Sequence, residues 1–91
     1  MVWSIKTTDS NLQLLAKNHF GSKLPTLEQM QSAVGGYIEF VRITTDGAMM
    51  VVNEDGRLKK LPYNKVASIM AGRNIVGDVL IFSKKEMEEM E

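Results

Sequence analysis

The chain has 91 residues, and its 11 basic and 11 acidic side chains give a formal net charge of zero at pH 7. This balance disfavours nucleic acid as a partner, because binding a phosphate backbone requires an excess of positive charge. Cysteine is absent, which excludes disulfide bonds and thiolate metal sites and suits a reducing compartment. We therefore expect one domain over residues 1–91.

The sequence also predicts a cytoplasmic protein without membrane association. The longest uninterrupted apolar run, Ala48 to Val52, is far shorter than a membrane span. Residues 1–10 lack the charged start and the apolar stretch of a signal peptide.

The first predicted element is a strand at residues 2–7, which is rich in strand-forming residues. A helix is predicted over residues 8–21. Ser10 and Gln13 have the spacing of a capping box, and Gly21 suits the end of a helix.

A second helix is predicted over residues 25–36, where Thr26 and Gln29 repeat the capping box. We expect Gly35 to take the left-handed conformation that ends a helix and Gly36 to let the backbone turn into a strand. The side chains expected to face the sheet are Leu27, Met30 and Val34.

A three-stranded antiparallel meander is predicted next, with strands at residues 37–43, 48–53 and 57–61. The connecting sequences TTDG and NEDG each place a carboxylate directly before a glycine. This pattern is typical of a type I turn followed by a left-handed glycine in a bulge. Asn53 is expected to accept a hydrogen bond from the backbone two residues further on.

The last third of the chain predicts a short helix at 61–74, with Pro62 in its first turn and Gly72 near its end. We expect this helix to turn Tyr63, Val66, Ile69 and Met70 toward the sheet.

A strand at 75–82 is predicted to be central, because its residues are almost continuously apolar. Gly77 and Asp78 inside it indicate a bulge or a close backbone approach. A C-terminal helix at about 84–90 starts with a Ser83–Glu86 capping box, and its acidic end is expected to fray. Met87 and Met90 are expected to pack this helix onto its own sheet. The predicted fold is α+β, with a small mixed or antiparallel sheet.

No catalytic or metal site is predicted. His19 is the only histidine, so the chain cannot form a histidine-rich zinc site. The NEDG sequence matches a fragment of a calcium loop, but basic residues occupy the positions of further oxygen ligands. Glu39 and Asp78 could act as acid and base only if their strands were adjacent. We expect no cofactor.

The best candidate for a contact surface is a cluster of basic residues. Such a cluster could bind a phosphate, a carboxylate or an acidic partner. We favour the alternative that these side chains protect an edge strand from pairing with another sheet. The cluster consists of Arg57, Lys59, Lys60 and Lys65.

Three blocks of the sequence resemble a family of small domains of unknown function that occur mostly in bacteriophages and on mobile elements. The blocks are VGGYIE at 34–39, NEDGRLKKLPYN at 53–64 and GDV at 77–79. The family pattern is V-G-G-Y-I-E, N-E-[DE]-G-x-L-K-x-L-P-x-N and I-x-G-D-[VI]. The resemblance covers residues 26–82 and departs from the pattern at 9–25, where we expect an extra helix. It implies a phage or plasmid accessory protein and no particular activity.

Two functions remain open. The first is a non-enzymatic module that binds a host or phage protein by strand addition at a sheet edge. The second is binding of a small anion such as a nucleotide near the glycine pair or Gly77. A pocket lined by Tyr37, Glu39, Lys59 and Asp78 would favour the second function. A homodimer is compatible with both functions, and a weak enzyme is the third alternative.

Overall fold

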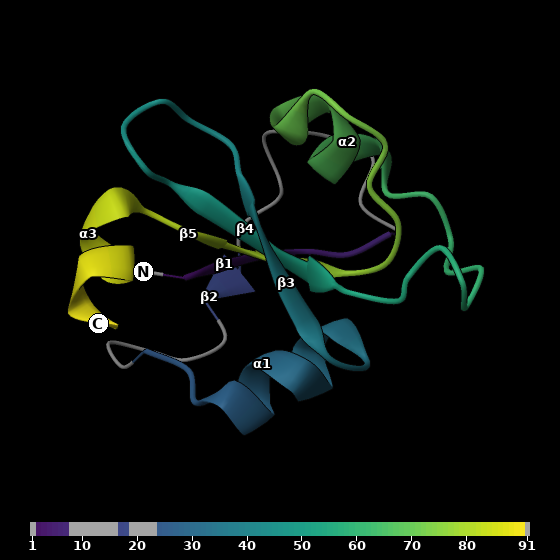
Figure 1. Cartoon of the computed structure of the whole chain (residues 1–91), viewed down its shortest axis with the longest axis horizontal. Coiled ribbons are helices and arrows are strands. Elements are labelled where there is room, and N and C mark those ends of the chain that lie inside the picture. Colours follow the sequence, from purple (N-terminus) through teal and green to yellow (C-terminus); the bar gives the residue numbers. More distant parts are fainter. Residues whose placement is uncertain (1, 8–16, 19–23, 91) are drawn as a thin grey trace.

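The computed structural model describes residues 2–7, 17–18 and 24–90 (Figure 1). Together these residues form an α+β fold, as predicted. The strands are β1 (Trp3–Ile5), β2 (Lys17–Asn18), β3 (Ile38–Arg42), β4 (Met49–Asn53) and β5 (Val79–Phe82). The helices are α1 (Leu27–Val34), α2 (Lys65–Ala71) and α3 (Lys84–Glu89).

The strands form one sheet in the order β2-β1-β5-β4-β3, with antiparallel pairing between all neighbours in the described part of the chain. The apolar strand β5 is central, as predicted, and pairs with β1 on one side and β4 on the other. It begins at Val79 and not at residue 75 as expected, so Gly77 and Asp78 precede the strand. Strand β3 forms one edge of the sheet and the two-residue strand β2 forms the other.

Apolar side chains cover both faces of the sheet in two separate clusters. On one face, Val66 and Ala67 of α2 pack against the strands. On the other face, Met30 and Val34 of α1 are buried, and α1 and α2 lie on opposite sides of the sheet (Figure 1). Met87 and Met90 pack against this second cluster, as predicted for the C-terminal helix. Leu27 does not belong to the buried stripe, since it is 55% exposed.

The capping boxes at the starts of α1 and α3 are confirmed. In α1, the Gln29 backbone N–H donates to Thr26 Oγ1 at 3.1 Å, and the Thr26 N–H donates to Gln29 Oε1 at 2.8 Å. Ser83 and Glu86 repeat this exchange at 3.2 and 2.9 Å. Gly35 ends α1 with a φ of 82°, in the predicted left-handed conformation.

The first predicted connection of the meander is present as a turn between β3 and β4, but the expected bulge is absent because the register of the two strands has no extra residue. Residues 44–47 connect β3 to β4, and the Ile43 N–H donates to the Ala48 carbonyl at 3.0 Å. Gly47 has a φ of 114°. The Ala48 N–H donates to the Thr44 hydroxyl at 3.0 Å, so a side chain completes the turn.

The predicted third strand of the meander, at 57–61, is wrong. Residues 54–60 form a tight helical turn, in which Leu61 N–H donates to the Gly56 carbonyl at 3.0 Å and Lys60 N–H donates to the Arg57 carbonyl at 3.1 Å. These are the two bonds of a Schellman motif, and Lys60 takes its left-handed position with a φ of 55°. A Cβ on buried Gly56 would lie 2.9 Å from Val76 Cγ2, so this glycine permits close packing rather than a hairpin.

The predicted helix at 61–74 is shorter than expected. It begins at Lys65 because Asn64 caps it, so Pro62 lies before the helix and not in its first turn. Tyr63 instead forms an isolated antiparallel bridge with Val76. Val66 faces the sheet as predicted. The expectation was wrong for Tyr63, Ile69 and Met70, which are all exposed.

The N-terminal helix predicted for residues 8–21 is wrong at Lys17–Asn18, which pair with β1 as strand β2. The rest of that segment, with its Ser10–Gln13 capping box and His19, lies outside the described residues. Among the described helices, none has both the length and the apolar character that crossing a membrane requires.

Candidate functional site

The motif residues around Asn53 hold α1 to the end of β4. Asn53 Nδ2 donates to the Val34 carbonyl at 3.0 Å, and its Oδ1 accepts from the Asp55 N–H at 2.8 Å, as predicted. Lys59 Nζ donates to the Gly35 carbonyl at 3.4 Å. It therefore places a positive charge at the negative end of the α1 dipole. A Cβ on Gly36 would lie 2.7 Å from Lys59 Nζ and 2.9 Å from Asn53 Nδ2, so these two side chains occupy the space beside Gly36.

A second junction connects α2 to the central part of the sheet. The fully buried Asn64 side chain donates to the carbonyls of Ile5 and Gly77 at 3.1 and 2.9 Å and accepts from Ala67 N–H at 3.0 Å. Gly77 has a φ of 80°, and a Cβ there would lie 2.8 Å from Leu61 Cδ1. The close approach that we predicted at Gly77 is therefore present, and it leaves no room beside this glycine for an anion.

The structure does not bring Glu39 and Asp78 together. Glu39 lies on β3, whereas Asp78 directly precedes β5, and β4 lies between these two strands. Asp78 Oδ1 accepts from the Thr7 N–H at 2.9 Å, which ties the segment after β1 to the start of β5. The arrangement required for acid and base catalysis by this pair is absent.

The other candidate residues are spread over separate surfaces. Tyr37 and Lys59 line one shallow hollow, and Glu39 and Arg57 line another. Asp78 lines a third hollow, of about 420 Å³, together with Ser4 and Gln29. Because residues 57–61 are not a strand, the edge-protection explanation for the basic cluster is also wrong. Lys60 and Lys65 are exposed, at the end of the helical turn and at the start of α2.

The hollow beside β3 is the most polar of these features. It has a volume of about 220 Å³ and an apolar floor that includes Val41 and Ile75. Arg57 Nη2 donates to the Asn74 carbonyl at 3.4 Å, a long bond. No ion pair joins the four charged residues that line it in the described structure, namely Glu39, Glu54, Arg57 and Arg73. Ligand pockets usually measure about 300–1,000 Å³, so this hollow is small for a nucleotide.

The open edge of β3 is the second feature of this side of the molecule. The Glu54 N–H donates to the Tyr37 carbonyl at 2.9 Å, and Ile43 bonds Ala48 in the same ladder. Because bonding alternates along an antiparallel pair, the odd-numbered residues of β3 bond β4 and the even-numbered residues direct their N–H and C=O groups outward. The outward-directed backbone groups are those of Ile38, Phe40 and Arg42.

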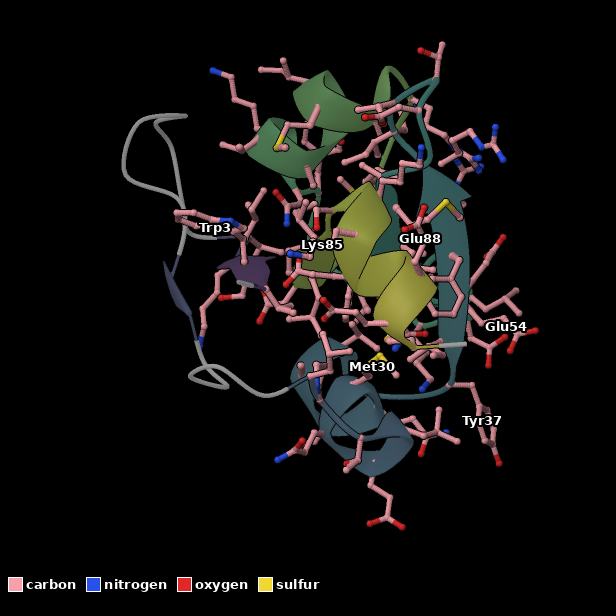
Figure 2. The ribbon with its side chains drawn as sticks, turned by 90° about the vertical axis from the view of Figure 1, so that its left-hand side faces the viewer. Trp3, Met30, Tyr37, Glu54, Lys85 and Glu88 are labelled. Carbon is pink, nitrogen blue, oxygen red and sulfur yellow. The ribbon has the colours of Figure 1, made fainter. Side chains whose placement is uncertain are left out.

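Side chains along this edge are also accessible. Tyr37 is 68% exposed and Phe40 is 38% exposed. Tyr37 and Glu54 point outward on the same side of the molecule (Figure 2). The sequence analysis predicted the strand but did not single out Phe40, Arg42 or Arg73. The order of strands decides that Phe40 and Arg42 lie at an edge, and Arg73 lines the same hollow as Arg57 only because α2 folds onto the sheet.

Residues 11–91 match the family model for a domain of unknown function, DUF3846. The chain belongs to the DUF3846 family. The match extends beyond residues 26–82, which resemble the family pattern, and it includes most of residues 9–25, where the sequence departs from that pattern. Neither a curated protein nor a solved structure matches the chain significantly.

Proposed function

We propose that this DUF3846 chain is a non-enzymatic protein-interaction module that binds an extended segment of its partner along β3. The supporting observation is the open edge, where the backbone groups of Ile38, Phe40 and Arg42 point away from β4. Such a row of unpaired donors and acceptors is a template for an added strand. In this binding mode, main-chain hydrogen bonds supply affinity and alternate side chains supply specificity.

The character of β3 supports a binding edge over a protected one. Natural sheets protect their edges with short strands, prolines, bulges or charged side chains, lysine above all. Strand β3 carries two charged residues, Glu39 and Arg42, but it has five residues without proline or lysine, and its register with β4 is continuous over all five pairs. The opposite edge strand, β2, has only two residues.

We propose that the partner is a protein of a phage or of its bacterial host and that the two proteins bind in the cytoplasm. The resemblance to the family pattern supports a phage or plasmid origin of the chain. A second copy of the chain is the competing occupant of β3, and the two are distinguished by whether the isolated protein sediments as a monomer or as a dimer.

Binding of a small anion is the alternative function. Its support is the hollow in which Arg57 and Arg73 lie above an apolar floor. We favour strand addition because Glu39 and Glu54 line the same hollow and offset the two positive charges. Side chains also occupy the space beside two of the three candidate glycines, Gly36 and Gly77.

Replacing Arg42 with proline tests the proposal. The change removes an N–H that points outward and leaves the bonds between β3 and β4 in place, because prolines are tolerated on the free side of an edge strand. Peptides selected from a random display library against the protein should bind Arg42→Pro about tenfold more weakly, given one lost hydrogen bond and a steric block. Arg42→Ala, which removes only the side chain, should reduce the affinity of these peptides by a smaller factor.

Amide hydrogen exchange gives an independent measurement. The Phe40 amide should exchange quickly in the free protein and slowly in the complex, since the added strand would accept its hydrogen bond. Equal binding of the selected peptides to Arg42→Pro and Arg42→Ala, with no protection of Phe40, would contradict strand addition.

A further inference from the structure

We infer that the segment that binds β3 runs antiparallel to it and has a defined charge order: an acidic residue opposite Arg42, an apolar residue opposite Phe40 and a basic residue opposite Glu39. This inference rests on the proposed function and specifies the chemistry of the partner. Every described strand pair in the sheet is antiparallel, and antiparallel pairs are slightly more stable per residue than parallel ones.

The two faces of the added strand would meet different side chains of β3. Phe40 pairs with Val51, so its side chain lies on the face that α1 covers. Glu39 pairs with Val52, so its side chain lies on the face that α2 covers. Arg42 shares the face of Phe40, because side chains alternate along a strand.

Directly opposed residues of an antiparallel pair interact most strongly, and opposite charges there are stabilising. Glu39 would occupy a non-hydrogen-bonded pair with the added strand, where the two side chains are closest. Glu54, Arg57 and Arg73 line the same hollow as Glu39. Together with Glu39 they sum to zero charge, so the nearest group, the Glu39 carboxylate, determines which charge is favoured opposite it.

A second copy of β3 does not satisfy this charge order. In a twofold pair, the outward-directed residues must face each other, so even-numbered residues of one strand oppose even-numbered residues of the other. Glu39 and Arg42 therefore never come opposite each other. With Phe40 paired to Phe40, Arg42 would oppose Ile38 and Glu39 would oppose Val41. We accordingly assign β3 to a different protein and not to a second copy of the chain.

Two peptides of identical composition test the charge order. The first has the core Glu-Val-Tyr-Lys-Val, which places Glu opposite Arg42 and Lys opposite Glu39. The second exchanges the two charged residues. In a titration followed by the Phe40 amide signal, the protein should prefer the first peptide by about 5- to 30-fold, as expected for two cross-strand charge pairs. Added salt should reduce this preference.

The double variant Glu39→Lys with Arg42→Glu is the matched test of cause. It should prefer the second peptide by a similar factor, and circular dichroism should show an unchanged fold because both side chains are exposed. Equal affinity of both peptides, or binding of neither, would overturn the inference. The proposed function would survive that result if the selected peptides still bind the Arg42→Pro variant more weakly than the unchanged protein. If no peptide binds at β3 of the unchanged protein, both proposals are overturned.

Discussion

At the level of single residues, the buried Asn64 connects three separate parts of the described structure. Its side chain makes three hydrogen bonds, to β1, to Gly77 and to the first turn of α2. Its main-chain carbonyl also accepts from the Ser68 hydroxyl at 2.6 Å. A buried amide that satisfies several carbonyls is difficult to replace, because each carbonyl left without a partner costs free energy.

Asn64→Ala should therefore lower the free energy of unfolding by about 2–4 kcal/mol. This sum combines the loss of a helix cap, about 1 kcal/mol, with the cost of leaving buried carbonyls without a hydrogen-bond donor, about 1–3 kcal/mol. Urea unfolding measures the change. The control is Asn74→Ala, because Asn74 is exposed. A loss below about 0.5 kcal/mol, the size of an ordinary surface substitution, would contradict this role for Asn64.

At the level of elements, the helical turn at 54–60 determines the path between β4 and α2. Its left-handed residue is Lys60, whereas α1 and α2 both end in a left-handed glycine. A residue with a Cβ pays about 1–2 kcal/mol for this conformation. The turn is therefore less stable than the two helix ends that it resembles.

Lys60→Gly should raise the free energy of unfolding by about 0.5–1 kcal/mol. The free energy gained by removing the left-handed strain is larger than the entropic cost of ordering a glycine, which is more flexible in the unfolded chain. Leu58→Gly is a suitable control, because Leu58 lies in the same turn, is 84% exposed and lacks a positive φ. It should lower stability by about 0.5–1 kcal/mol. Thermal unfolding of both variants should show shifts of opposite sign, and a shared sign would argue against the Schellman geometry.

At the level of the whole molecule, two carboxylates make the free energy of unfolding depend on pH. Burial raises the pKa of Glu86, but hydrogen bonds, among them those with the backbone and hydroxyl of Ser83, outweigh this effect and hold the pKa below its ordinary value of 4.5. The Thr44 hydroxyl likewise lowers the pKa of Asp46 in the hairpin. A carboxylate with a lowered pKa stabilises the fold above its ordinary pKa, and this contribution is lost as the pH falls through its folded value.

The free energy of unfolding should thus decrease as the pH falls below about 4.5. Glu86→Gln keeps an oxygen for the Ser83 N–H, so the capping box can persist, but it removes the charge. At pH 7 the variant should be less stable by about 0.5–1.5 kcal/mol, and the difference should disappear in acid as Glu86 takes up a proton. Urea unfolding at several pH values measures this gap, and a gap that stays constant would exclude Glu86 as its source.

Local signals in the sequence predicted several elements correctly. The capping boxes at Thr26 and Ser83, the TTDG hairpin and the apolar strand β5 all depend on residues that are close in sequence. The same rules failed at NEDG, because the Gly56 position is determined by contact with Val76, twenty positions away. The predicted helix at Lys17–Asn18 failed for a similar reason, since pairing with β1 overrides local preference.

The candidate site was less predictable than the fold. The motif residues Asn53, Lys59 and Asp78 stood out in the sequence, and all three hold elements together through hydrogen bonds to distant backbone. The proposed binding edge instead depends on the order of the strands. Strand β4 pairs with β5 on one side and with β3 on the other, and this order leaves β3 at the edge of the sheet. No pattern within residues 37–43 encodes that order.

The central position of β5 has a consequence for how the chain folds. Of the five described strands, β5 is the last in sequence, yet it occupies the place between β1 and β4. Before β5 pairs with them, the β3–β4 hairpin is not joined to β1 in the sheet and exposes an apolar flank. Completion of the sheet is therefore a late, long-range event, of the kind that slows folding and leaves newly made chains vulnerable to aggregation.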